Sequence, residues 1–221
     1  MNTQRLTLIT AAIVAVALIG IIIYSRLQPS PATPTQSNAS AELTYDDQPR
    51  LGDPDAPVVL AVFEDFKCPA CKFFEENVLP QLERDYIATG QAQVYFFNFP
   101  FIGPDSTTAA IAGECAYQQN EAAFWEYKTI LFRAQGPESQ QWATPARLEE
   151  LANNLGDLDA AALRECTEED RYADLVASER RLGEDAGVTG TPSLYIDGVK
   201  LENANDYSAV QTAIDEALAS D

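Results

Sequence analysis

The longest apolar stretch of the chain lies at its beginning. Residues 6–25 contain no charged side chain, and about 20 apolar residues suffice for a helix to cross the hydrocarbon core of a bilayer. The stretch is longer than the apolar region of a typical secretory signal peptide, and no Ala-x-Ala site follows it directly. We therefore predict an uncleaved transmembrane signal anchor preceded by the tail of residues 1–5. A cleaved signal peptide is the alternative.

The composition changes after this stretch. Residues 26–48 are rich in Pro, Ser, Thr and Ala, which is typical of an extended, solvated spacer without a core of its own. The positive charges that flank the apolar stretch are too few to set its orientation in a membrane. We predict a flexible linker here, followed by one globular domain over residues 49–221.

The first part of this domain shows a strand, a helix and a second strand. Residues 58–66 begin as a continuous apolar run, as expected for a strand that is buried on both faces. Residues 72–88 repeat apolar side chains at helical spacing, and residues 91–100 have the character of another strand. These residues therefore form a predicted strand-helix-strand unit.

The second part begins with a block that contains only helical patterns. Residues 104–186 carry helix start and stop signals throughout, and we predict an all-helical insertion. Residues 193–202 then alternate around an Asp-Gly turn, and residues 206–219 form a final amphipathic helix. The sheet thus draws its strands from 49–103 and 187–221, which predicts an α/β domain.

Charge and composition exclude several classes of function. The 221 residues have a formal net charge of -20 and an isoelectric point near 4.1, so a phosphate backbone would be repelled and nucleic-acid binding is not expected. Histidine is absent, which removes His-based metal sites, Ser-His-Asp triads and Cys-His pairs. The four cysteines form an even set, which fits an oxidising compartment.

The strongest chemical signal is Cys68-Pro69-Ala70-Cys71, which follows the first strand and opens a helix. At a helix N-terminus, unpaired N–H groups and the helix dipole favour a thiolate over a thiol, and Cys68 takes that place. Pro69 suits a first helical turn, where the missing N–H would have no partner. Cys71 follows one turn later, close enough to close a small disulfide ring.

Two other uses of this pair have to be weighed. The pair could be an inert structural disulfide, or it could be half of a zinc site completed by Cys115 and Cys166. Zinc sites usually take their ligands from two close pairs, but 50 residues separate Cys115 from Cys166. We predict no metal site.

Together, the motifs carry a family resemblance. FEDFKCPACKFFEENVLPQLERDY, followed by a strand, a helical insertion and the Val-Thr-Gly-Thr-Pro segment that ends at Pro192, resembles the DsbA-like thiol:disulfide oxidoreductases of the thioredoxin superfamily over residues 49–221. The resemblance implies a thioredoxin-like fold with an inserted helical subdomain. It also implies that Pro192 is cis, and that Thr191 offers backbone groups to an extended substrate peptide beside Cys68.

The chain departs from this family at two positions. The buried acid that often lies six residues before the first cysteine is replaced by Val62, with Glu64 and Asp65 closer to the motif. Ala70 replaces the histidine of the strongest periplasmic oxidants, so one source of thiolate stabilisation is missing. We therefore predict a reduction potential below those oxidants and above thioredoxin's.

The other two cysteines lie in the helical block. Ile111 precedes Cys115 and Leu163 precedes Cys166 at helical spacing, so both thiols should point inward. We predict a structural disulfide, which would contribute roughly 4 kcal/mol for a loop of this length. Two free buried thiols are the alternative.

These observations predict a protein disulfide oxidoreductase. We expect a single-pass protein of the cell membrane that oxidises cysteine pairs in extracytoplasmic proteins without a cofactor. Its expected partners are cysteine-containing, folding proteins and, by the resemblance, a membrane quinone-linked thiol oxidase. One alternative is a reductase or isomerase with the same site. Another is a non-catalytic, membrane-tethered binding or chaperone module with structural disulfides.

Overall fold

The computed structural model describes residues 41–220 of the chain. The predicted membrane helix of residues 6–25, its tail and the first part of the predicted linker lie outside these residues and stay predictions. Within the described part, no helix combines the length and the apolar surface that crossing a bilayer requires.

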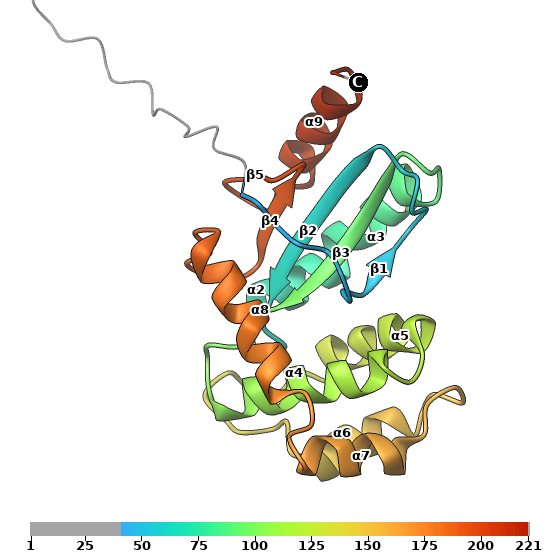
Figure 1. The fold of residues 1–221 in the computed structure, drawn as a ribbon, viewed down its shortest axis with the longest axis vertical. Coiled ribbons are helices and arrows are strands. Elements are labelled where there is room, and N and C mark those ends of the chain that lie inside the picture. Colours follow the sequence, from blue (N-terminus) through green and yellow to red (C-terminus); the bar gives the residue numbers. More distant parts are fainter. Residues whose placement is uncertain (1–40, 221) are drawn as a thin grey trace, which may run out of the picture. The chain divides into compact units, whose positions relative to one another are not determined.

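A mixed sheet of five strands organises the domain, in the spatial order β1, β3, β2, β4, β5 (Figure 1). β2 runs parallel to β3 on one side and antiparallel to β4 on the other. The edge strands β1 and β5 pair antiparallel with their neighbours. The strands are β1 (Arg50–Leu51), β2 (Val58–Glu64), β3 (Ala92–Asn98), β4 (Ser193–Ile196) and β5 (Val199–Lys200).

The crossover from β2 to β3 is a continuous helical segment with two wide turns. The helices α2 (Pro69–Phe73) and α3 (Leu79–Leu82) alternate with the π-helical turns η1 (Phe74–Val78) and η2 (Glu83–Ile87). The helix begins earlier than the predicted start at residue 72, because Pro69 occupies its first turn. The wide turns add residues that a search for the α-helical period does not register.

The insertion between β3 and β4 consists of five helices. α4 packs against α5 and α7, α6 packs against α7, and α8 returns the chain to β3 (Figure 1). The block is not helical throughout, because residues 134–144 form a loop where Gly136 and Pro137 interrupt the helical pattern. The helices are α4 (Pro104–Tyr117), α5 (Glu121–Arg133), α6 (Pro145–Ala152), α7 (Ala160–Glu168) and α8 (Ala173–Asp185).

The two faces of the sheet belong to two apolar clusters, and β2 contributes to both. Alternate residues of a strand point to opposite faces. Val62 therefore packs with the crossover and insertion helices, while Phe63 packs with Phe97 and Tyr195 on the other face. Glu64, two residues after Val62, lies on the face that carries the crossover helix. Burial of both faces confirms the interpretation of the apolar run.

The C-terminal part returns to the sheet as a hairpin and a helix. Asp197 and Gly198 both have positive φ, at 48° and 78°, the conformation that an Asp-Gly hairpin turn requires. Helix α9 (Tyr207–Leu218) then packs against β2 and β4. The sequence predicted both elements, but it missed β1, whose two residues are too few to show an alternating pattern.

Candidate active site

The two cysteines of the dithiol motif occupy different environments at the start of α2. Cys68 directly precedes the helix, and Cys71 lies in its first turn. Both are free thiols in this structure. Cys68 is 6% exposed and Cys71 is 0% exposed. A substrate therefore meets the sulfur of Cys68 first.

The surroundings of Cys68 favour its thiolate. Its pKa is lowered from 9.0 to about 6. The largest cause is a hydrogen bond from the thiol of Cys71, and Thr191 and the backbone N–H groups of Cys71 and Ala70 add to it, while burial opposes the shift. Hydrogen bonds to the charged form outweigh the cost of removing it from water.

Cys71 shows the opposite shift. Burial raises the pKa of Cys71 well above its usual value, and the hydrogen bond to Cys68 and the charge of Glu64 raise it further. Near neutral pH the pair therefore holds a thiolate at Cys68 and a thiol at Cys71. Because the thiolate is the nucleophile and the better leaving group, exchange with other molecules should pass through Cys68.

Alkylation of the reduced protein should show this asymmetry. We expect the rate at Cys68 to rise through a midpoint near pH 6, because the reagent reacts with the thiolate. The lowered pKa of Cys68 stabilises the folded, reduced protein at alkaline pH. This contribution is lost as the pH falls through about 6. Peptide mapping by mass spectrometry measures both sites. Cys71→Ala should move the midpoint upward, and a wild-type midpoint near 9.0 would contradict the assignment.

A buried ion cluster lies on the Cys71 side of the site. Lys128 on α5 is 0% exposed, and its Nζ lies 3.0 Å from Oε2 of Glu64 and also pairs with Glu75. The ammonium lies over three aromatic rings, with the ring centre of Phe96 at 5.0 Å. One cation thus faces two carboxyl groups in a dry interior.

The charges of this cluster are not balanced if both glutamates are ionised. Burial raises the pKa of Glu64 well above 4.5; Lys128 opposes this rise and Glu75 adds to it. Burial lowers the pKa of Lys128, but the two glutamates outweigh it and leave the pKa raised. The lysine therefore stays charged, and Glu64 is a group that can hold a proton near Cys71.

Glu64 lies close to where the family has its buried acid. The family position for a buried acid is apolar here, but Glu64 lies two residues later on the same face of β2 and acts electrostatically on Cys71. One signal in the sequence could have pointed to its partner. Lys128 interrupts an otherwise apolar face of α5, beside Phe124 and Phe132 at helical spacing.

The loop from the other end of the domain closes the site. The peptide bond between Thr191 and Pro192 is cis. The sulfur of Cys68 lies 3.3 Å from the carbonyl oxygen of Thr191, to which its thiol form donates a hydrogen bond. The fold thus brings the Thr-Pro segment to the dithiol, as the resemblance implied.

The helical insertion also holds the active-site loop. Nε2 of Gln135 donates to the carbonyl oxygens of Phe66 and Cys68, at 2.7 and 3.0 Å. Lys67 forms a buried ion pair with Asp105, with Nζ 2.6 Å from Oδ1. The pattern of the sequence did not indicate these residues, because each contact joins segments that are far apart along the chain.

The remaining cysteines bond to each other. Cys115 of α4 and Cys166 of α7 form a disulfide with a Cα–Cα distance of 6.1 Å. Their pairing leaves no thiolates to complete a zinc site with the dithiol. Among residues 41–220, no group of three or more His, Cys, Asp or Glu side chains is arranged to hold a metal ion.

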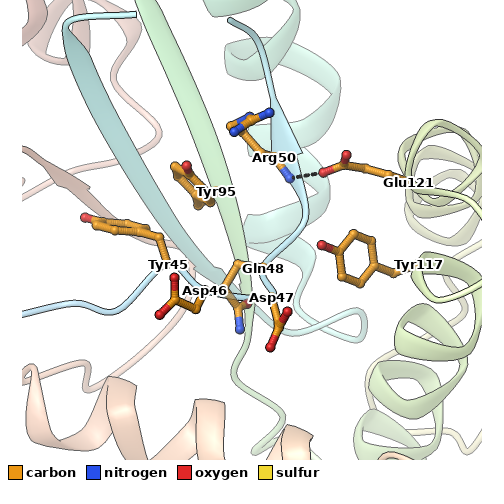
Figure 2. Close-up of a pocket in the computed structure, with 8 residues that line it drawn as sticks. All are labelled: Tyr45, Asp46, Asp47, Gln48, Arg50, Tyr95, Tyr117 and Glu121. Atoms are coloured by element: carbon orange, nitrogen blue, oxygen red, sulfur yellow. Dashed lines mark hydrogen bonds between the residues drawn. The ribbon is translucent and has the colours of Figure 1, made fainter. Parts of the chain in front are cut away.

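A polar cavity of about 330 Å³ opens elsewhere on the domain, beside β1 and β3 (Figure 2). Within it, the backbone N–H of Arg50 donates to Oε1 of Glu121 at 2.7 Å. Its lining comprises Tyr45, Asp46, Asp47, Gln48, Arg50, Tyr95, Tyr117 and Glu121. No cysteine lines it, so we assign it no part in thiol exchange.

The fold is that of the thioredoxin-fold thiol:disulfide oxidoreductases. Residues 44–216 match the thioredoxin family. The chain therefore belongs to this family, as a DsbA-like protein disulfide oxidoreductase and a homologue of BdbD.

Individual relatives support this membership over most of the chain. The probable disulfide bond formation protein D of Bacillus anthracis is 33% identical, over 95% of this chain and 94% of the relative. The crystal structure of oxidised BdbD from Bacillus subtilis matches with a TM-score of 0.78 at 30% identity, over 81% of this chain and 97% of that one. The structure of DsbA from Chlamydia trachomatis matches with a TM-score of 0.72 at 25% identity, over 79% and 93%.

Proposed function

We propose that the protein oxidises cysteine pairs in extracytoplasmic proteins through a disulfide between Cys68 and Cys71. The observation that carries this proposal is the opposite shift of the two pKa values, lowered to about 6 for Cys68 and raised for Cys71. A stabilised thiolate favours the reduced enzyme, and this makes its disulfide a stronger oxidant. The name of the B. subtilis relative, disulfide bond formation protein D, supports the same direction.

The proposed exchange has two steps. A substrate thiolate attacks the sulfur of Cys68, the Cys68–Cys71 bond breaks, and Cys71 leaves as a thiolate that takes up a proton. A second substrate thiolate then attacks the substrate sulfur of the mixed disulfide and releases Cys68 as a thiolate. Two electrons pass from the substrate, which gains a disulfide, to the enzyme. We assign the proton that Cys71 takes up to Glu64.

The other site residues would bind and orient the substrate. Thr191 and Pro192 lie beside the sulfur of Cys68, where an extended peptide can pair with the backbone. Pro69 and Ala70 form the turn between the cysteines. Reoxidation would come from a membrane quinone-linked thiol oxidase, and an anchor over residues 6–25 would keep the domain beside it.

The pKa of Cys68 gives the approximate size of the expected change in reduction potential. At pH 7, a thiol with a pKa of about 6, compared with about 7 in thioredoxin, favours the reduced form by about 1 kcal/mol, which corresponds to about 20 mV. The gap between thioredoxin and the strongest periplasmic oxidants is about 150 mV. We therefore expect a potential above thioredoxin's and well below that of those oxidants.

The test is the redox equilibrium of the full-length protein in detergent against graded glutathione buffers, together with catalysed oxidation of a reduced, unfolded disulfide protein. A potential above thioredoxin's with catalysed oxidation would support the oxidase. A thioredoxin-like potential without oxidation would instead favour a reductase or isomerase. A pair that never equilibrates with glutathione would leave the binding or chaperone module.

A further inference from the structure

Asn205 reaches the active-site loop from the segment between β5 and α9. Its side-chain Nδ2 donates a hydrogen bond to the carbonyl oxygen of Ala70 at 3.1 Å, across 135 residues of sequence. The backbone N–H of Asn205 donates to Oδ1 of Asn203 at 3.1 Å, and Asp206 caps α9 directly after it. These hydrogen bonds hold the segment that carries the side-chain amide of Asn205.

The orientation of this amide follows from its partner. A carbonyl oxygen only accepts hydrogen bonds, so the NH₂ group of Asn205 must face Ala70 and its Oδ1 must face away. That Oδ1 is buried and has no partner in the described part of the chain.

The carbonyl of Ala70 is linked to the dithiol through one peptide unit. The C=O of Ala70 and the N–H of Cys71 belong to the same planar unit and point in opposite directions. A hydrogen bond accepted by the carbonyl polarises the unit and strengthens its N–H as a donor. This N–H is one of the groups that lower the pKa of Cys68 by hydrogen bonding to its sulfur.

We propose that Asn205 is a positioning residue for the dithiol, which holds and polarises the Ala70–Cys71 peptide so that its N–H stabilises the thiolate of Cys68. The inference deepens the proposed function and rests on it. Only the reduced enzyme carries a charge on Cys68, so the bond favours the reduced state and raises the oxidising power. It supplies part of the stabilisation that a side chain such as histidine would give at position 70, where this chain has alanine.

The test compares wild type, Asn205→Ala and Asn205→Asp in the full-length protein. Aspartate keeps the shape of the side chain but has no donor and adds a negative charge. We expect the pKa of Cys68, measured by ultraviolet thiolate absorbance, to rise by roughly half a unit in Asn205→Ala and by more in Asn205→Asp. In Asn205→Ala, the equilibrium constant for reduction of the enzyme by glutathione at alkaline pH should fall about threefold. This lowers the reduction potential by about 15 mV.

A matched control removes a similar bond far from the site. Nδ2 of Asn153 donates to the carbonyl oxygen of Glu149 at 3.1 Å, at the end of α6. Asn153→Ala should leave both the pKa of Cys68 and the glutathione equilibrium unchanged.

Several outcomes would overturn the assignment. Folded Asn205→Ala and Asn205→Asp proteins with wild-type pKa and equilibrium would refute it, and so would a loss of stability alone. If Asn205→Ala does not fold, Asn205→Leu, which is neutral and has no donor, is compared with wild type instead. A thioredoxin-like potential in wild type would reject the oxidase, but a higher pKa of Cys68 in Asn205→Ala would still support the role of Asn205.

Discussion

Cys68→Ser is expected to reduce catalysed thiol exchange to the uncatalysed rate, and Cys71→Ser is expected to accumulate mixed disulfides with substrate. Serine forms no disulfide, so the first variant has no site for the substrate to attack. In the second variant, the thiolate of Cys68 can attack a substrate that already carries a disulfide, such as a glutathione-capped cysteine, and the Cys71 thiol that would displace the substrate from the mixed disulfide is missing. Non-reducing electrophoresis with mass spectrometry of the adducts measures both effects.

A control variant separates the dithiol from the other disulfide. The Cys115→Ser/Cys166→Ser protein should keep its exchange activity and lose roughly 4 kcal/mol of stability. The order of attack is tested by which single variant traps substrate. Adducts on Cys71 in the Cys68→Ser protein, with none on Cys68 in the Cys71→Ser protein, would show that the buried sulfur is attacked first and would refute the proposed mechanism.

Lys128→Met should cost at least about 3 kcal/mol of unfolding free energy near neutral pH, because Glu64 and Glu75 would remain buried without a cation. In the variant, the pKa of Glu64, which already lies well above 4.5, should rise further in the folded state because Lys128 no longer opposes the rise. A carboxyl group whose pKa is raised in the folded protein destabilises the fold more as the pH rises. The loss of unfolding free energy in Lys128→Met should therefore be smaller in acid. Urea unfolding between about pH 5 and pH 8 measures this dependence.

Two controls test whether unpaired charge is the cause. Adding Glu64→Gln and Glu75→Gln to Lys128→Met should recover most of the lost stability, since the remaining groups are neutral. Arg164 forms an exposed ion pair with Glu149, so Arg164→Met should change stability little. A Lys128→Met protein as stable as wild type at alkaline pH would contradict this account, because a buried unpaired charge and a carboxyl group kept protonated far above its usual pKa both cost free energy.

The order of the elements could be predicted because it depends on local patterns. The apolar run after residue 58, the helical spacing after Pro69 and the Asp197-Gly198 turn each act over a few neighbouring residues. The errors concern features without a local pattern, such as the two-residue strand β1 and the wide turns of the crossover helix. The predicted anchor over residues 6–25 lies outside the described residues and remains a prediction from hydropathy.

The same contrast between local sequence and tertiary structure applies to the active site. The sequence by itself determined that Cys68 and Cys71 open a helix after a buried strand, because this depends on residues that are adjacent along the chain. Only the tertiary structure brought Glu64 and Lys128 to the Cys71 side of the site, and Asn205 to Ala70. Burial and hydrogen bonds act through space between distant segments. The place of the dithiol could therefore be predicted from the order of residues, but the pKa values of its two thiols are set by the folded chain.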